Sequence, residues 1–261
     1  MTTQNSAVAL QGDVLRRLPL PPADASVIPG VRWGRPEALF SPAFWRTQAW
    51  YRQLQSVPHD FRIGQSLAEE VAACLLGGYG MPAELGLAAF RRVQAHGLLS
   101  GPPWASEHDF VAALNEPFPH PDGPRRYRFP NQRGARLARA LAALHRDPPP
   151  VDNPLAFREV LLGIPGIGYK TASWIARNHL GADCFAILDI HVMRAGYLLG
   201  LWDKTASPGR EYLPLEATFV RFARAIGIAA SILDAVMWNV MRQLGRVALD
   251  AMPRTEQSVT R

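Results

Sequence analysis

The chain has few cysteines and no long apolar run. Its 261 residues include only two cysteines, Cys74 and Cys184. Two thiols cannot build a disulfide framework or supply four ligands to an iron–sulfur cluster, and no His/Cys spacing is typical of a zinc site. No segment resembles a signal peptide or a membrane span. We therefore expect a reducing, intracellular compartment, no membrane partner and no protein-ligated metal.

Lysine is nearly absent as well. Lys170 and Lys204 are the only lysines among 28 basic residues, and the remaining 26 are arginines, whose planar guanidinium suits phosphate oxygens. The net charge of +6 and the isoelectric point of about 9.8 predict an anionic partner. A general preference for arginine codons would give the same bias, so composition alone does not identify that partner.

Apolar residues recur with helical spacing through most of the chain, and alternating strand patterns are scarce. The proline-rich residues 1–40 predict an irregular leader, partly disordered. Residues 41–261 are long enough to form a proper core, and they predict an all-α fold. Helices are expected over residues 44–54, 66–76, 82–96, 110–114, 131–145, 152–164, 171–180, 215–226 and 232–247, and after Asp189.

Residues 152–180 predict a helix, a tight hairpin and a second helix. Asn153 followed by Pro154 is typical of a helix start. Glycines then interrupt the apolar periodicity and permit close backbone approach. Because the second helix begins at the hairpin, the backbone N–H groups of Gly166 and Gly168 can face a phosphate. A helix–helix corner whose glycines serve packing alone is the alternative.

The hairpin string LLGIPGIGYKTASWIA, followed by AILDIHVMRAG, resembles the helix-hairpin-helix DNA glycosylase superfamily. That family combines a hairpin L-P-G-I-G-x-K-T-A with a later V-D-x-H-V. Ile164 and Leu188 stand where the pattern has leucine and valine. A lysine at the hairpin resembles the bifunctional glycosylase/lyase members, including the 8-oxoguanine branch. The matching positions are Pro165, Gly166, Ile167, Gly168, Lys170, Thr171, Ala172, Asp189, His191 and Val192.

The resemblance implies a two-lobed helical DNA glycosylase fold, with the hairpin and Asp189 bordering the cleft between the lobes. It implies that the partner is double-stranded DNA carrying a damaged base. We accordingly expect a monomer that acts in the cytoplasm at the nucleoid, or elsewhere inside the cell with DNA. The resemblance also implies a monovalent cation at the hairpin, and no organic cofactor is expected.

The chemistry of Lys170 and Asp189 suits breakage of a glycosidic bond. A carboxylate beside the sugar stabilises an oxocarbenium-like transition state. A neutral lysine can attack C1′ and form a Schiff base, and the positive end of a helix dipole disfavours the ammonium form. Taken separately, Asp189 could only cap the next helix and Lys170 could be a solvated lysine. Inside the motif, we predict that both are catalytic.

Three side chains are candidates for the base pocket or for the wedge that fills the gap left by a flipped base. Tyr79 is the only bulky residue of the turn Gly77–Gly80, where relatives often carry Gln or Asn. Asp234 and Trp238 lie one helical turn apart and match an aspartate and a tryptophan of compact archaeal-type 8-oxoguanine glycosylases. The alternatives are a tyrosine and a tryptophan packed in the core and a surface aspartate.

Contacts to the DNA backbone are predicted at Arg133, Arg136 and His191. The two arginines belong to the arginine-rich segment 125–146, which could equally be a solvated helix face. His191 is chosen by resemblance, because the matching histidine of relatives lies near the DNA backbone.

The sequence therefore predicts a base-excision-repair DNA glycosylase with AP lyase activity that removes an oxidised purine such as 8-oxoguanine. One alternative is the same chemistry on another damaged or modified base. The other is a non-enzymatic helix-hairpin-helix module that only binds DNA, which would not need Lys170 and Asp189 at this spacing.

Overall fold

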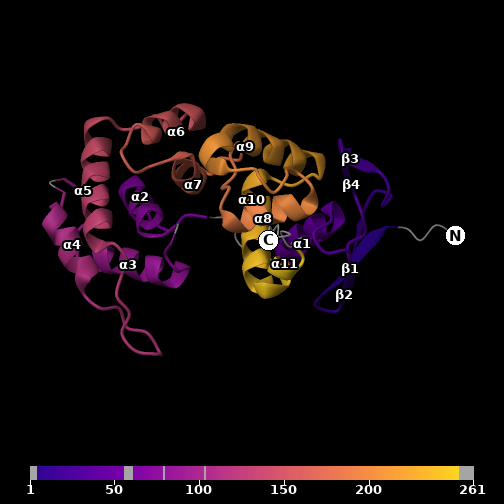
Figure 1. The fold of residues 1–261 in the computed structure, drawn as a ribbon, viewed down its shortest axis with the longest axis horizontal. Coiled ribbons are helices and arrows are strands. Elements are labelled where there is room, and N and C mark those ends of the chain that lie inside the picture. The colour runs from indigo at the N-terminus through magenta and orange to yellow at the C-terminus, as the bar shows by residue number, and fades with distance from the viewer. Residues whose placement is uncertain (1–4, 56–60, 79, 103, 253–261) are drawn as a thin grey trace, which may run out of the picture. The chain divides into compact units, whose positions relative to one another are not determined.

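The computed structural model describes residues 5–55, 61–78, 80–102 and 104–252 (Figure 1). Helices dominate the described residues, so the predicted all-α class is confirmed, and the chain divides into two compact units. Unit 1 combines Met1–His59 with Asp183–Arg261, and unit 2 is Asp60–Ala182. Among the described residues, no helix has both the length and the apolar character required to cross a bilayer.

Unit 1 contains short strands where the sequence predicts an irregular leader over residues 1–40. The strands β1 (Ser6–Gln11) and β2 (Val14–Pro19) form an antiparallel hairpin, and β3 (Ser26–Ile28) pairs with β4 (Val31–Arg32). Both pairs are short, and most residues of the first pair are exposed. They therefore lack the apolar alternation by which a half-buried strand is identified in a sequence.

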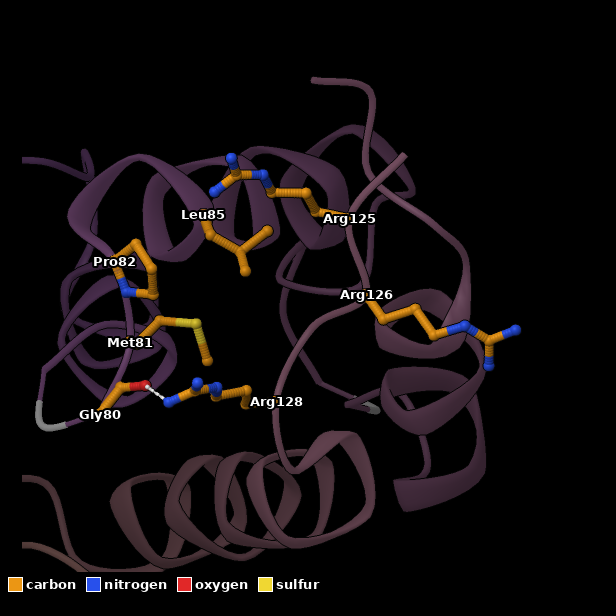
Figure 2. Close-up of a pocket in the computed structure, with 7 residues that line it drawn as sticks. All are labelled: Gly80, Met81, Pro82, Leu85, Arg125, Arg126 and Arg128. Carbon is orange, nitrogen blue, oxygen red and sulfur yellow. Dashed lines mark hydrogen bonds between the residues drawn. The ribbon is translucent and has the colours of Figure 1, made fainter. Parts of the chain in front are cut away.

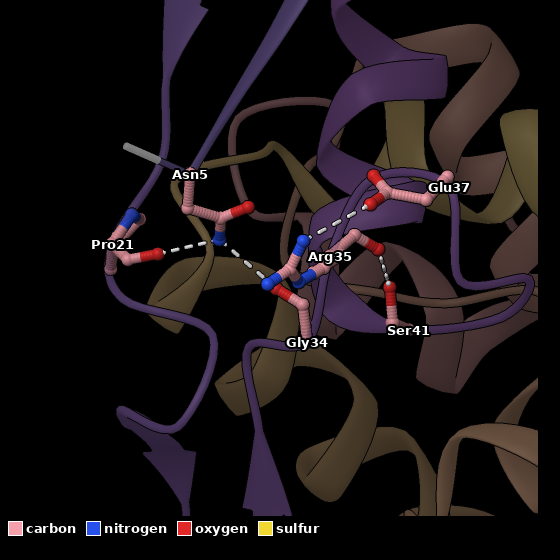
Figure 3. Close-up of polar contacts among 6 residues, drawn as sticks. All are labelled: Asn5, Pro21, Gly34, Arg35, Glu37 and Ser41. Atoms are coloured by element: carbon pink, nitrogen blue, oxygen red, sulfur yellow. Dashed lines mark hydrogen bonds and ion pairs between the residues drawn. The ribbon is translucent and has the colours of Figure 1, made fainter. Parts of the chain in front are cut away.

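The N-terminal segment is tied to the start of helix α1 (Pro42–Leu54) by polar contacts (Figure 3). The Asn5 side-chain amide donates to the carbonyls of Pro21, at 2.6 Å, and Gly34, at 3.0 Å. Ser41 is the N-cap of α1, and its hydroxyl donates to the carbonyl of Arg35 at 2.8 Å. Side-chain hydrogen bonds thus order a stretch in which regular strand pairing is brief.

The remaining helices of unit 1 pack around α10 (Ala230–Leu244), which contacts α1, α8 (Ile190–Leu199), α9 (Pro208–Ala225) and the short α11 (Arg246–Asp250). β1 lies against α1, and β3 lies against α9. Burial of large apolar side chains is the main stabilising contribution to such a core. The largest buried side chains here are Trp45, Phe185, Phe219 and Phe222.

Unit 2 is built around α2 (Leu67–Leu76), whose last seven residues are all buried. Helix α2 packs against α3 (Ala83–Ala95), α5 (Pro130–Arg146) and α7 (Tyr169–Leu180), while α4 (Glu107–Asn115) packs on α5 and α6 (Pro154–Leu162) on α7. Phe110, Leu137, Leu141, Phe157 and Ile175 fill its core.

A buried polar network links α2 and α7 to the segment that precedes α2. Glu70 has no exposed surface, and its carboxylate accepts hydrogen bonds from the amides of Ile63 and Gly64 and, at 2.6 Å, from the side chain of Asn178. Arg177 donates to the same Asn178. Since a buried charge is tolerated only when it is hydrogen-bonded, the network fixes these three segments together.

The hairpin between α6 and α7 has the predicted form. Ile164 and Ile167 are buried and anchor it, and the amide of Ile167 donates to the carbonyl of Ile164 at 3.0 Å. Gly166 has a φ of +94°, a left-handed conformation that favours glycine. A Cβ at Gly166 would stand 3.0 Å from Cδ of Arg136, so this arginine of α5 lies directly against the hairpin.

We expect Glu70→Ala to lower the free energy of unfolding by about 3 kcal/mol, because it leaves buried donors without an acceptor. Glu159→Ala, which removes an exposed carboxylate from α6 of the same unit, should change it by less than about 0.5 kcal/mol. Urea unfolding of both variants measures the difference. Equal stabilities would show that the Glu70 network does not hold unit 2 together.

Gly166→Ala should lower the free energy of unfolding by about 1–2 kcal/mol, because alanine is strained at positive φ. Its Cβ would also press on Arg136. Gly168→Ala is the matched control, since Gly168 has a φ of −100° and open space around the position of a Cβ. Thermal unfolding of the two variants should separate them, and an equal loss at Gly168 would contradict the strain argument.

Candidate functional site

Lys170 lies in the first turn of α7, two residues after Gly168, the N-cap of that helix. Its side chain is half-buried. Nζ lies 5.8 Å from the ring centroid of Trp174, one turn further along α7, within range of a cation–π contact. A Cβ at Gly78 would stand 3.6 Å from Nζ. The amine therefore lies beside Gly78, in the turn that follows α2.

The Cys74 thiol, in the same unit as this amine, is not a competing nucleophile. Cys74 is buried in α2, and burial, followed by the charge of Glu70, raises the pKa of its thiol well above the usual value. The positive charges of Arg177 and Lys170 only partly oppose that shift. Because the reactive form of cysteine is the thiolate, Cys74 stays inert at neutral pH.

The C-terminal carbonyls of α2, just before the glycine turn, are held by two side chains. The Tyr127 hydroxyl donates to the carbonyl of Leu76, and Arg133 Nη1 donates to that of Leu75 at 2.6 Å. Burial raises the pKa of Tyr127, so the hydroxyl remains a donor. Arg133, predicted to contact phosphate, thus uses one N–H group inside unit 2. Tyr79, the predicted wedge, lies outside the described residues.

Arg136 is better placed than Arg133 to meet an anion at the hairpin. Its side chain is half-buried and lies against Gly166. Within the part of the chain that the structure describes, it has no hydrogen-bond or ion-pair partner. The hairpin N–H groups and this guanidinium are therefore neighbouring positive groups, the combination that binds a phosphate.

A basic pocket of about 560 Å³ lies where α3 begins (Figure 2). Arg128 reaches toward Gly80 and donates to its carbonyl at 3.3 Å, Arg125 pairs with Asp122 at 3.3 Å, and Arg126 points away from the other labelled side chains. The sequence identifies the segment that contains these arginines, but it does not predict that they line a pocket together with the start of α3. The residues that line the pocket are Gly80, Met81, Pro82, Leu85, Arg125, Arg126 and Arg128.

Asp189 is the N-cap of α8, as one of the two sequence interpretations expects. Its Oδ1 accepts hydrogen bonds from the amides of His191 and Val192, both at 2.9 Å. The residue is half-buried, and its Oδ2 accepts no hydrogen bond from any residue that the structure describes. The cap fixes the orientation of the carboxylate while Oδ2 stays available to a substrate.

Asp234 and Trp238 lie one turn apart on α10, as expected, but in different environments. Asp234 is only 1% exposed, so the alternative of a surface aspartate is wrong; its Oδ2 accepts a hydrogen bond from the amide of Ile187 at 3.0 Å. Trp238 is half-buried and meets the ring of His191 edge-on, with centroids 6.3 Å apart. The guanidinium of Arg242 lies 5.2 Å from the Trp238 ring.

Two side chains near Asp189 that the sequence does not reveal as functional are Tyr212 and Glu216 of α9. Both are buried, and both contact the backbone of the segment 183–189 that leads to Asp189. The sequence did contain one indication that Glu216 is buried. Glu216 follows Leu215 and precedes Phe219 by three residues, so it borders the apolar face of its helix.

Comparison with known proteins identifies relatives of this chain. A curated 8-oxoguanine DNA glycosylase/AP lyase of Metallosphaera sedula is 37% identical over 83 residues, which cover 31% of this chain and 39% of the relative. The match thus spans about two fifths of that relative's length.

Solved structures extend the likeness over three quarters of the chain. The 8-oxoguanine DNA glycosylase of Thermotoga maritima is 25% identical with a TM-score of 0.51, over 76% of this chain and 88% of that one. The enzyme of Methanocaldococcus jannaschii is 23% identical with a TM-score of 0.58, over 76% and 92%; it supports the shared fold. The profile of one family, described as 8-oxoguanine DNA glycosylase, matches residues 60–228. Because that match covers well over half of the sequence, the chain belongs to the 8-oxoguanine DNA glycosylase family.

Proposed function

We propose that this protein is a DNA glycosylase and AP lyase that excises an oxidised purine such as 8-oxoguanine from double-stranded DNA. The observation that carries the proposal is Lys170: an amine in the first turn of the helix after the hairpin, beside a glycine turn, within the motif of the family. The relatives, which are 8-oxoguanine DNA glycosylases, support the choice of base. A solved Methanocaldococcus jannaschii relative was crystallised with DNA that contains 8-oxoguanine.

In the first step, the neutral Lys170 amine attacks C1′ of the damaged nucleotide, and the bond from C1′ to the base breaks with its electrons leaving on the base. Positive charge develops on the sugar as that bond lengthens. The Asp189 carboxylate stabilises this charge, and its Oδ1 is already oriented by the α8 amides. Ring opening then gives a Schiff base between Nζ and C1′.

In the second step, a C2′ proton is removed and the 3′ phosphate leaves, which cuts the strand by β-elimination. The protonated Schiff base accepts the electrons of the broken C–H bond, and water later releases Lys170. Asp189 is the carboxylate that we assign to the proton transfers. Arginine could not replace Lys170, because a guanidinium does not lose its proton in proteins.

The hairpin and its neighbour hold the DNA backbone in this proposal. Amides of Gly166 and Gly168, together with the dipole of α7, attract a phosphate, directly or through a monovalent cation, and Arg136 adds a charge beside them. His191 contacts the backbone and Trp238, next to it, stacks on the flipped base. Tyr79 remains the proposed wedge. The reaction needs no organic cofactor, and a monomer that reaches cellular DNA is sufficient.

Borohydride trapping tests the lyase. The wild-type protein should form a covalent adduct with a duplex that carries 8-oxoguanine, and Lys170→Gln should reduce that adduct to background. Lys204→Gln is the matched control, because Lys204 is exposed and is the only other lysine of the chain. It should trap DNA as the wild type does.

Other outcomes separate the alternatives. Intact binding of duplex DNA with no adduct on any lesion would favour the non-enzymatic binding module. An adduct with a duplex that carries an oxidised pyrimidine, and none with 8-oxoguanine, would support the same glycosylase and lyase reaction on a different damaged base. An adduct that survives in Lys170→Gln would assign the nucleophile to another amine.

Arg136→Ala should weaken binding to all DNA sequences to a similar degree and reduce the slope of log affinity against log salt by about 0.9, the loss of one phosphate contact. Arg146→Ala removes the same charge from the exposed C-terminal end of the same helix and serves as the control. Fluorescence anisotropy over a salt series measures both. Equal slopes for the two variants would remove Arg136 from the interface.

A further inference from the structure

We propose that Asp234, together with Glu216 and Tyr212, positions Asp189 by holding the backbone in front of it, and that Asp234 does not read the damaged base. This inference rests on the catalytic role of Asp189 in the proposed function. It gives three buried side chains of unit 1 a part in base excision without contact to the DNA.

The segment 183–189 has neither helix nor strand pairing, so its backbone N–H groups need acceptors from elsewhere. Side chains of α9 supply two contacts. Glu216 Oε1 accepts a hydrogen bond from the amide of Ala186 at 3.1 Å. The Tyr212 hydroxyl donates to the carbonyl of Ala186 at 2.7 Å and lies 3.4 Å from the amide of Leu188, which donates to it. These two side chains bracket the segment from one helix.

Asp234 of α10 holds Ile187, which lies between Ala186 and Leu188 in the sequence. Its Oδ2 accepts a hydrogen bond from the amide of Ile187 at 3.0 Å, and the carbonyl of Ile187 in turn accepts one from the amide of Asp189 at 2.8 Å. A continuous path of two hydrogen bonds therefore runs from the Asp234 carboxylate to the main chain of Asp189. Three successive amides, at residues 186, 187 and 188, donate to three side chains.

The burial of these groups shows that they act inside unit 1. Asp234, Glu216 and Tyr212 are 1%, 5% and 6% exposed. A carboxylate is seldom buried to this degree, because it loses its hydration, unless fixed donors replace the water. Hydrogen bonds to an ionised acceptor are also stronger than neutral ones. Such a segment resists small displacements better than an ordinary loop.

Base reading by Asp234 would require a different geometry. An oxygen that accepts the hydrogen bonds of a flipped purine must face the DNA, whereas Oδ2 of Asp234 faces the Ile187 amide and the side chain is enclosed. Trp238, one turn further along α10, is half-exposed. The two residues therefore have different roles: Trp238 contacts the base, and Asp234 holds the segment 183–189 that leads to Asp189.

A double-mutant cycle measures whether Asp234 acts through Asp189. Single-turnover release of 8-oxoguanine from a duplex is followed for wild type, Asp234→Ala, Asp189→Asn and the double variant. We expect Asp234→Ala to slow release by about 10- to 100-fold, because misplacement of a catalytic group by about 1 Å has that effect. In the Asp189→Asn background, the same change should slow release by less than about twofold. Affinity for the lesion duplex should not change.

The controls separate positioning from base reading and from a general loss of structure. Asp234→Asn keeps an acceptor for the Ile187 amide and should retain a rate within about threefold of wild type. Trp238→Ala should weaken lesion binding and be additive with Asp189→Asn. Tyr212→Phe removes only a hydroxyl and should be non-additive with Asp189→Asn, which keeps the inference testable if Asp234→Ala does not fold.

Additive losses for Asp234→Ala and Asp189→Asn, or an altered preference of Asp234→Asn between 8-oxoguanine and guanine, would assign Asp234 to base reading and overturn the inference. If the wild-type protein releases no base, the proposed function fails instead. Hydrogen exchange at the Ile187 amide then still tests whether this amide donates a hydrogen bond to Asp234. Faster exchange in Asp234→Ala than in wild type supports it, and unchanged exchange contradicts it.

Discussion

Backbone amides outside regular secondary structure must find acceptors in the protein, and this structure depends on buried carboxylates to supply them. Glu70 accepts from the amides before α2, and Glu216 and Asp234 accept from the amides before α8. Each carboxylate comes from a helix and serves a neighbouring segment without regular structure. These hydrogen bonds fix the position of each helix relative to the neighbouring segment, which burial of apolar side chains alone does not do.

The two units contribute complementary chemistry to the proposed reaction. Unit 2 supplies cationic and donor groups: the Lys170 amine, the hairpin amides and the Arg136 guanidinium. Unit 1 supplies the Asp189 carboxylate and the aromatic ring of Trp238. DNA offers a chain of anions and, once a nucleotide is flipped, a flat base and an electron-poor sugar. The first set of groups suits the phosphates and C1′, and the second suits the base and the charge that develops on the sugar.

The sequence predicted what depends on local pattern. The helices, the hairpin and the cap at Asp189 follow from periodicity, glycine and N-cap preferences. It missed the N-terminal strands, which are short, and it could not place Asp234 in the core, because the amide that it serves lies 47 residues earlier. Arg133 reads as a surface charge, yet it donates to the carbonyl of Leu75. Hydrogen bonds between residues this far apart in the sequence cannot be predicted from the spacing of residue types.

The cap formed by Asp189 has a consequence for how this family can vary. In the proposed reaction, one carboxylate both starts α8 and supplies negative charge to the sugar, but the two tasks need different properties. The helix needs only an oxygen acceptor, which asparagine offers equally well, whereas the chemistry needs the charge. A substitution that removes only the negative charge of Asp189 therefore separates its structural role from its proposed catalytic role. For the proposed enzyme, exchange of Asp189 for asparagine would therefore abolish base release and leave the fold and the proposed DNA contacts in place.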